Sequence, residues 1–307
     1  PYVDNITAAP FNYKPVGTGP FKFVEWRRGE YIRVERYDNY YRKGYPCLDA
    51  IITRVFRDPT SAVLALEKGD IHYIPGYFLP YSEAKRLSTS KNIVVTSKGS
   101  ALLSPMLYMF FNLRVEPLNN REFREAIAYA INKSEIVDKV LFGFGKEAIS
   151  PIPSTHWAFT RDVYIYEYNP EKSRSILDKL GFRDVDGDGY REYPNGSKLA
   201  LEIVYNAGSV IFERTAYLVQ DMLRKVGIKV DLRPYDEASI VGIVYRDHRF
   251  HITFERPFTA PDPGISVSRF YHSSFAATTI PYTNSAVGYN NSQVDMLSLI
   301  HISEPTR

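Results

Sequence analysis

Residues 108–153 constrain the fold more than any other stretch of this chain. They open with an apolar run, Tyr108–Phe111, which predicts a short buried strand. In Phe123–Ile131, apolar residues then recur at intervals of three and four, which is the stripe of an amphipathic helix. Asn119 or Asn120 stands before that stripe, where an asparagine side chain can cap the first backbone amides of a helix. The stretch is therefore predicted to begin as a strand followed by a helix.

A second helix is predicted directly after the first. Asn132 indicates its start, and Glu135, three residues on, would supply the return half of a capping box. Gly143 indicates its end, and Pro151 and Pro153 then favour an extended exit. The side chains of this helix that are expected to be buried are Ile136, Val137, Val140 and Leu141.

The second half of the chain continues to alternate strands and helices. Leu199–Tyr205 predicts a strand, Phe212–Val226 an amphipathic helix and Ile228–Leu232 a returning strand. This spacing is typical of a βαβ unit with a right-handed crossover. Asn169 and Pro170 indicate the start of a further helix, because proline is favoured in the first helical position.

The residues before position 108 predict shorter elements. A hairpin is expected between Phe21–Trp26 and Tyr31–Arg36, because apolar residues alternate with charged ones in the second of these segments. The other expected elements are strands at Ile51–Phe56, Ile71–Ile74 and Ile93–Ser97 and helices at Thr60–Leu66, which ends at Gly69, and Tyr81–Leu87. Together with the second half, these elements predict an α/β fold of the mixed, α+β kind.

Length and composition limit the possible classes of protein. A chain of 307 residues suggests about two domains, and a net charge of +3 gives no basis for nucleic-acid binding. The one cysteine, Cys47, cannot form a disulfide within the chain. No stretch reaches the ~20 apolar residues of a membrane-spanning helix. The sequence has no Gly-x-Ser-x-Gly, His-Glu-x-x-His or phosphate-loop motif, so an enzyme has no positive support.

A turn rich in acidic residues, DVDGDGY, allows two interpretations. Asp184, Asp186 and Asp188 stand at positions 1, 3 and 5 of a calcium-binding loop, and Gly189 stands at position 6. Position 12 would be Asn195, however, where a full loop of this kind has a bidentate glutamate. A bound calcium ion and an acidic turn without metal therefore both stay open, and no other cofactor is expected.

Several segments resemble one protein family. The run NNREFREAIAYAINKSEIVDKVLFGFGKEAISPIP is similar to the most recognisable segment of the family-5 solute-binding proteins of ABC importers, the receptors for oligopeptides, dipeptides, nickel and oligosaccharides. Asn132 stands where that family usually has aspartate, which is also a good cap. The further matches, in family order, are Gly17–Phe21, Leu48–Ile51 with Ala62–Asp70, and Gln220–Val230. The resemblance thus covers most of the chain.

The resemblance implies a two-lobed fold of the periplasmic-binding-protein type II, here incomplete. Residues 1–103 would form part of lobe I with a mixed sheet, and residues 104–296 most of lobe II. Residues 297–307 do not continue the family pattern and are expected to be a non-native tail. The family's N-terminal portion and true C-terminus are expected to be missing, which would expose sheet edges and favour aggregation.

The resemblance also implies a receptor that binds and does not catalyse. Its lobes would close around a small ligand by a hinge motion, and the closed form would dock on the permease subunits of an ABC transporter. The implied localisation is periplasmic or extracellular and membrane-associated. The complete protein would be a monomer that binds no nucleic acid.

The family's cleft implies a set of ligand-binding positions. They are Gly76, Tyr77, Met106, Tyr108, Trp157, Glu255, Phe258, Thr259 and Asp262. Aromatic platforms would come from Tyr77, Tyr108, Trp157 and Phe258. The 24 tyrosines of the chain fit either such a cleft or an ordinary sheet surface, because tyrosine combines a flat apolar face with a polar tip.

The residue at position 259 bears on the choice of ligand. Peptide receptors of this family often have an aspartate there, which pairs with the free α-amino group of the ligand, whereas this chain has Thr259. Because an ammonium group buried without a carboxylate is costly, Thr259 favours a neutral ligand unless Glu255 supplies the charge. An oligopeptide is the first expectation, an oligosaccharide the second, and nickel or a nickel chelate the third.

Two other classes of protein are alternatives to an import receptor. A glycoside hydrolase acting on the same sugar would need two carboxylates about 5–10 Å apart across a cleft, and the sequence identifies no such pair. A sensor that uses the same lobes without transport is the other alternative.

Overall fold

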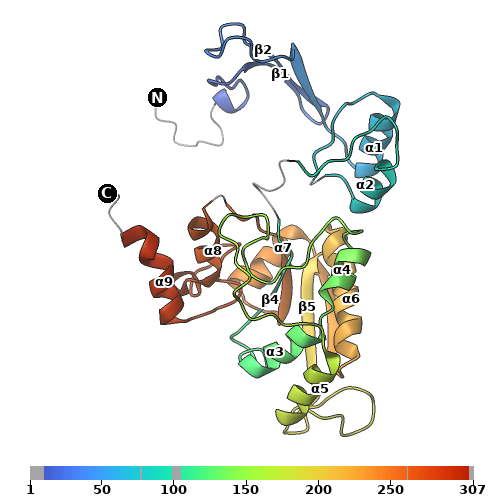
Figure 1. The fold of residues 1–307 in the computed structure, drawn as a ribbon, viewed down its shortest axis with the longest axis vertical. Coiled ribbons are helices and arrows are strands. Elements are labelled where there is room, and N and C mark those ends of the chain that lie inside the picture. The colour runs from blue at the N-terminus through green and yellow to red at the C-terminus, as the bar shows by residue number, and fades with distance from the viewer. Residues whose placement is uncertain (1–9, 77, 99–104, 261, 304–307) are drawn as a thin grey trace. The chain divides into compact units, whose positions relative to one another are not determined.

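The computed structural model describes residues 10–76, 78–98, 105–260 and 262–303 (Figure 1). The chain divides into two compact units, residues 1–93 (unit 1) and residues 94–307 (unit 2). The lobe boundary expected between residues 103 and 104 lies outside the described residues. Among the described helices, none combines the length and the apolar character that crossing a membrane requires.

The described residues of unit 1 form a three-stranded antiparallel sheet of order β1-β2-β3 and two α-helices. The strands are β1 (Phe21–Arg27), β2 (Tyr31–Arg36) and β3 (Ala50–Arg54), and the helices are α1 (Pro59–Lys68) and α2 (Tyr81–Leu87). A 3-10 turn, Pro10–Asn12, precedes them. The predicted hairpin and both predicted helices are confirmed, and Gly69 ends α1 in the left-handed conformation with φ 81°.

Two strands predicted in this part of the chain are wrong. Ile71–Ile74 and Ile93–Ser97 are irregular. The backbone N–H of Ile71 donates instead to the carbonyl of Ala65, in the last turn of α1. A short apolar run forms a strand only where a neighbouring strand takes up its backbone hydrogen bonds, and no described strand pairs with these segments.

Unit 2 is built on a four-stranded sheet of order β4-β7-β5-β6. The central strand β5 (Ala200–Asn206) pairs in parallel with both β6 (Lys229–Tyr235) and β7 (Ile252–Glu255). Strand β4 (Tyr108–Phe111) is an outermost strand of the sheet and runs antiparallel to β7. Helix α6 (Val210–Arg224) connects β5 to β6, which confirms the predicted strand–helix–strand unit.

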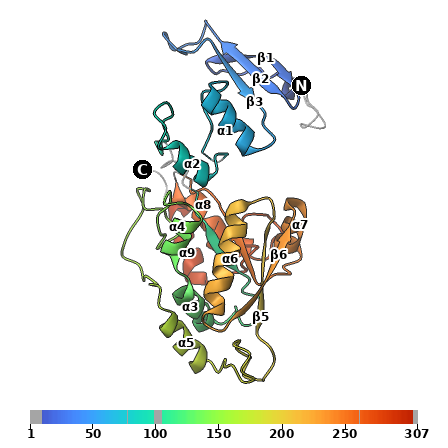
Figure 2. The same ribbon diagram turned by 90° about the vertical axis from the view of Figure 1, so that its right-hand side faces the viewer.

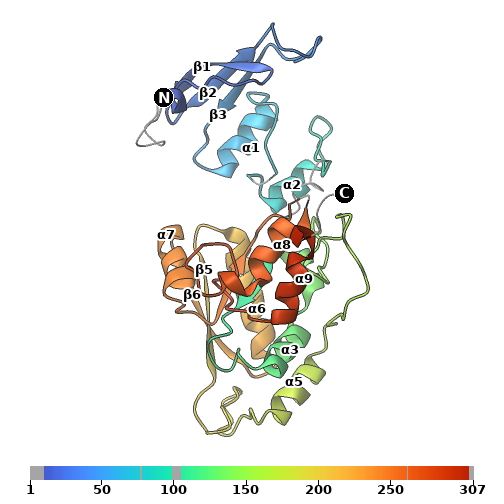
Figure 3. The same cartoon turned by 90° about the vertical axis from the view of Figure 1, so that its left-hand side faces the viewer.

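The remaining helices of unit 2 complete a three-layered body. They are α3 (Arg121–Ala130), α4 (Lys133–Lys139), α5 (Pro170–Lys179), α7 (Glu237–Val241), α8 (Pro263–Tyr271) and α9 (Ser292–Ser303), with a π-helical segment at Gly242–Arg246 and a 3-10 turn at Ser273–Phe275. Helix α9 therefore runs through part of the expected tail. Figure 2 shows α6 over one face of the sheet, and Figure 3, from the opposite side, shows α8 and α9 in front.

Successive residues of the sheet enter two separate cores. Leu201 and Ile203 of β5 are fully buried in the larger core, which also holds the apolar stripes of α3, α5 and α6. Val204 of β5 and Phe110 of β4 enter a smaller core with residues of α7, the π-helical segment and α8. The period-two alternation of a strand thus places a helical layer on each face of the sheet.

The caps of α3 and α4 follow the prediction with one exception. Asn120 and Asn132 each accept a hydrogen bond from the backbone amide three residues on, at 3.1 and 3.2 Å. The return half of the capping box does not form, because the carboxylate of Glu135 pairs with Lys139, four residues on along the same helix face (2.5 Å). Of the four side chains expected to be buried in this helix, Val140 alone is fully buried.

Candidate ligand-binding site

The carboxyl ends of β5 and β7 form one edge of the unit 2 sheet. Strand β5 ends at Asn206 and β7 ends at Glu255, and because the two strands are parallel these residues lie at the same edge. Strand β4 runs the other way, so its first residue, Tyr108, pairs with Glu255. Ligands of open α/β sheets bind outside the carboxyl ends of the strands, which makes this edge the candidate site.

The chain on either side of β4 and β7 extends the same edge. The backbone N–H of Met106 donates to the carbonyl of Pro257 at 3.1 Å, and Pro105 forms an isolated antiparallel bridge with Phe258. The Phe258 side chain is 54% exposed. The edge therefore presents an aromatic face close to the strand ends.

The proline-containing turn after the central helices lies against this edge. The hydroxyl of Tyr108 donates to the carbonyl of Pro151 at 3.1 Å. The Nε2 atom of His156 lies 3.2 Å from the carbonyl oxygen of Ala260, in the loop after β7. The next residue, Trp157, is 79% exposed. These contacts hold the turn against the edge, and an exposed aromatic residue follows directly after His156 in the chain.

Two of the implied positions have side chains that make contacts within unit 2, one of them buried and one exposed. Thr259 is only 5% exposed, and its hydroxyl lies 4.0 Å from the sulfur of Met106, which is also buried. Asp262 is the N-cap of α8, and its carboxylate accepts the backbone N–H of Gly264 at 2.8 Å. Helix α8 was not predicted, although aspartate followed by Pro263 is a signal for a helix start.

Two further implied positions, Gly76 and Tyr77, do not belong to unit 2. Gly76 lies in an exposed turn of unit 1. Tyr77 lies outside the described residues. The residues that the structure brings together at the sheet edge are Met106, Tyr108, Glu255, Phe258 and Thr259, and Trp157 follows His156 in the adjoining turn.

Glu255 is the acidic residue of the edge. The hydroxyl of Tyr245, in the π-helical segment, donates to Glu255 Oε1 at 2.5 Å. Burial raises the pKa of Glu255 to about 7, and the nearby charge of Glu237 acts in the same direction, while the hydrogen bond from Tyr245 opposes them. Near neutral pH the Glu255 carboxyl is therefore divided between its protonated and ionised forms.

Sequence analysis missed three polar residues beside Glu255. The carboxylate of Glu237 accepts hydrogen bonds from the hydroxyl of Tyr282 at 2.8 Å and from the side-chain amide of Asn206. All of them border the same cavity as Glu255. Asn206 could have been found as the last residue of a parallel strand, whereas Glu237 and Tyr282 reach the site only through tertiary packing.

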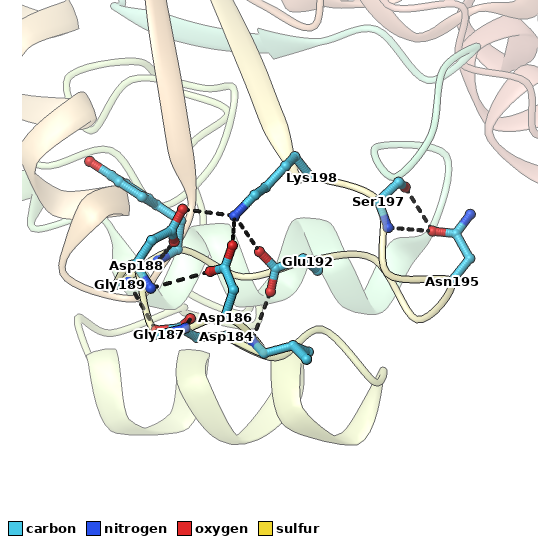
Figure 4. Close-up of polar contacts among 11 residues, drawn as sticks. Asp184, Asp186, Gly187, Asp188, Gly189, Glu192, Asn195, Ser197 and Lys198 are labelled. Carbon is cyan, nitrogen blue, oxygen red and sulfur yellow. Dashed lines mark hydrogen bonds and ion pairs between the residues drawn. The ribbon is translucent and has the colours of Figure 1, made fainter.

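The acidic turn lies away from this edge, between α5 and β5 in the chain. Figure 4 shows the ammonium group of Lys198 among the carboxylates of Asp186, Asp188 (2.8 Å) and Glu192 (2.9 Å). These contacts raise the pKa of Lys198, so it carries its charge at any physiological pH. The turn thus has a cation of its own, supplied by the chain.

The remaining contacts of the turn are those of a compact loop. The two oxygens of Asp184 accept the backbone N–H groups of Gly187 (2.7 Å) and Gly189 (2.9 Å). The carboxylate oxygens of Asp184, Asp186 and Asp188 lie within 4.8 Å of one another, a spacing that a metal ion could bridge. Because the ammonium group of Lys198 already pairs with Asp186 and Asp188, the contacts favour the interpretation without metal.

Replacing Lys198 should expose the latent affinity of the turn for calcium. In the native protein, about 1 mM calcium chloride should leave Tm unchanged, because the ion must displace Lys198. In Lys198→Met the same addition should raise Tm measurably, since uncompensated carboxylates bind calcium in the ~0.1–1 mM range. Lys225→Met, which removes another exposed lysine, is the control. A calcium-induced rise in Tm of the native protein equal to that of Lys198→Met would contradict this interpretation.

Comparison with known proteins decides the family. Residues 1–278 match the model of the bacterial extracellular solute-binding proteins, family 5 Middle. This chain is a family-5 solute-binding protein. The resemblance inferred from the sequence and the α/β fold that it implied are thus confirmed.

One relative and its solved structure agree with the assignment of this chain to family 5. The chain is 30% identical over 292 residues to the oligopeptide-binding protein AppA of Bacillus subtilis, covering 92% of this chain and 50% of AppA. The structure of that AppA in complex with a nonapeptide aligns with a TM-score of 0.74 at 28% identity, covering 98% of this chain and 58% of AppA. The chain thus spans about half the length of this relative.

Two other structures show the range of ligands among similar proteins. A periplasmic oligopeptide-binding protein of Thermotoga maritima aligns with a TM-score of 0.80 at 26% identity, covering 94% of this chain and 55% of its own. NikZ from Campylobacter jejuni, solved in complex with Ni(L-His), aligns with a TM-score of 0.78 at 25% identity, covering 98% and 58%. The family-5 fold alone therefore does not determine the ligand.

Proposed function

We propose that this protein is the ligand-capturing component of an ABC importer, which binds an oligopeptide-like molecule at the carboxyl-end edge of the unit 2 sheet and delivers it to a membrane permease. The observation that supports the proposal is that Tyr108, Glu255 and Phe258 lie at that edge, with the turn that contains His156 and Trp157 against it. The protein acts by binding and not by catalysis, outside the cytoplasm, in keeping with a family described as extracellular and solute-binding.

The side chains at the edge suit a peptide. Trp157 and Phe258 offer exposed aromatic faces, which pack against apolar side chains and peptide planes. Glu255 offers a carboxylate where Thr259 does not, so an amino group of the ligand has a partner of opposite charge. AppA of Bacillus subtilis, the relative at 30% identity, was solved with a nonapeptide.

An oligosaccharide is the second candidate ligand. The Thermotoga maritima protein was also solved with mannohexaose bound, and that structure aligns with a TM-score of 0.72 at 26% identity. Sugars stack on exposed aromatic rings and need no carboxylate partner, so Trp157 and Phe258 would serve them equally well. Nickel, suggested by NikZ, is the third candidate.

A thermal-shift screen with a peptide panel and an oligosaccharide panel tests the proposal. Peptides of three to nine residues should raise Tm, because a ligand that binds only the native state stabilises it. Phe258→Ala should weaken peptide binding by about tenfold, since an aromatic contact contributes ~0.5–1.5 kcal/mol beyond its buried area. The matched control is Phe144→Ala, which removes a ring that is 45% exposed, close to the 54% of Phe258. A rise in Tm with sugars alone would favour the second candidate, and no rise with either panel would contradict the proposal.

A further inference from the structure

We propose that the cavity beside Glu255 is a subsite for the positively charged end of a ligand, an alkylammonium group of the lysine type. The inference rests on the proposed function, because such a ligand would be held at the carboxyl-end edge of the unit 2 sheet. It adds a charge specificity that neither the family nor the related structures determine.

The cavity lies inside unit 2, where β5 and β7 end. Its volume is about 200 Å³, several times the ~30 Å³ that one water molecule occupies in the liquid. Its apolar walls are formed by Phe212, Ile240, Val241 and Phe254. Its polar groups are those of Asn206, Glu237, Tyr245, Glu255, Arg256 and Tyr282. Apolar walls with a few acidic groups suit a methylene chain that ends in an ammonium group.

The acceptor groups of the cavity are oriented by hydroxyl donors. Tyr245 donates to Glu255 Oε1 at 2.5 Å, and Tyr282 donates to Glu237 Oε1 at 2.8 Å, with the two tyrosine rings 5.6 Å apart. An ionised carboxylate has about four acceptor sites. Within the described part of the chain, one hydrogen bond reaches the Glu255 side chain, so it retains acceptors for an ammonium donor.

The charges around the cavity favour a cation. Glu237 on α7 and Glu255 on β7 are opposed by one guanidinium, that of Arg256, so the ionised lining carries −2 + 1 = −1. The other titratable groups that face Glu255 are the phenols of Tyr245, Tyr282 and Tyr108, which are uncharged at neutral pH.

Binding of an ammonium group in the cavity should release a proton from Glu255. Burial holds the pKa of Glu255 near 7, and an ammonium group in contact with the carboxylate would lower it again. Binding of the cation is therefore coupled to ionisation of Glu255 and strengthens as the pH rises from about 6 to 8. A Tyr245–Glu255 contact with a purely structural role would show no such coupling.

The test compares two tripeptides that differ in one charge. Ala-Lys-Ala and Ala-norleucine-Ala present side chains of similar length, with and without an ammonium group. At pH 8 we expect the lysine peptide to bind about tenfold more tightly to the native protein. The preference should fall to about twofold or less in Glu255→Gln and persist in Glu122→Gln, which removes a carboxylate on α3 outside the cavity. Calorimetry in two buffers of different ionisation enthalpy should detect proton release with the lysine peptide alone.

A second pair of probes examines the cavity without a peptide. n-Butylammonium, but not n-butanol, should raise Tm of the native protein at pH 8, and this rise should be absent in Glu255→Gln. Equal binding of both tripeptides, with no Glu255-dependent rise from n-butylammonium, would overturn the subsite and leave the proposed function standing. Binding of n-butylammonium without binding of any peptide would support the subsite and overturn the proposed function.

Discussion

Phe123→Ala should lower the free energy of unfolding of unit 2 by about 3–5 kcal/mol, the usual range for emptying a core phenylalanine site. Phe123 on α3 is fully buried, and its ring lies 5.0 Å from that of Phe182. It belongs to the core that joins α3, α5 and α6 to the sheet. Urea denaturation followed by circular dichroism measures the loss.

The control for this substitution is the same change at an exposed position. Phe144→Ala removes a ring that is 45% exposed, and we expect a loss of less than about 1 kcal/mol. If both variants lost the same stability, the assignment of Phe123 to the core of unit 2 would be wrong.

Glu255→Gln should make the protein more stable at pH 8 by about 2–4 kcal/mol while changing little at pH 4. The pKa of Glu255 is raised to about 7 in the folded protein, mainly by burial, from the ~4.3 of an exposed glutamate. Between these two values the unfolded chain has released this proton and the folded chain has not. The stability of the native protein therefore falls as the pH rises through this window, and glutamine removes that loss.

The comparison between the two proteins isolates this one group. Burial also lowers the pKa values of His248 and His251, but both histidines are present in both proteins and cancel in the difference. Urea denaturation at several pH values from 4 to 8 gives the two stability curves. Parallel curves would show that Glu255 is not the buried acid that the structure indicates. A site that reduces stability in the absence of ligand is typical of functional residues.

Local signals predicted most of the helices and strands. Asn120 and Asn169 each cap the helix that the sequence assigned to them, through a hydrogen bond to the third backbone amide. The parallel pair β5 and β6 followed from the periodicity of Leu199–Leu232. These elements depend on residues close together in the chain, which is why the sequence alone suffices.

The failures depend on contacts between residues far apart in the chain. Ile71–Ile74 has the apolar pattern of a strand but no described neighbour that pairs with it. The carboxylate of Glu135 had two competing partners, and Lys139 prevailed. Lys198, ten or more residues further along, pairs with Asp186 and Asp188, a contact that the acidic turn itself did not indicate. Local spacing cannot predict such partners.

The candidate site was predicted in the same uneven way. Family resemblance indicated Tyr108, Glu255, Phe258 and Trp157, and the structure places the first three at one edge and Trp157 next to His156 in the adjoining turn. It also placed weight on Thr259, whose hydroxyl is buried. The cavity could not be predicted, because Glu237 and Tyr282 meet there only after α7 and the loop beyond α8 have packed together.

The most direct test of the central claim, that ligand binds at the carboxyl-end edge of the unit 2 sheet, uses the fluorescence of Trp157. The chain has two tryptophans, so Trp26→Phe leaves Trp157 as the one reporter. Trp157 is 79% exposed, and a peptide that covers it should shift its emission to shorter wavelength in a saturable way, at the concentrations that raise Tm. A peptide that raises Tm without changing this emission would place the ligand elsewhere and contradict the account.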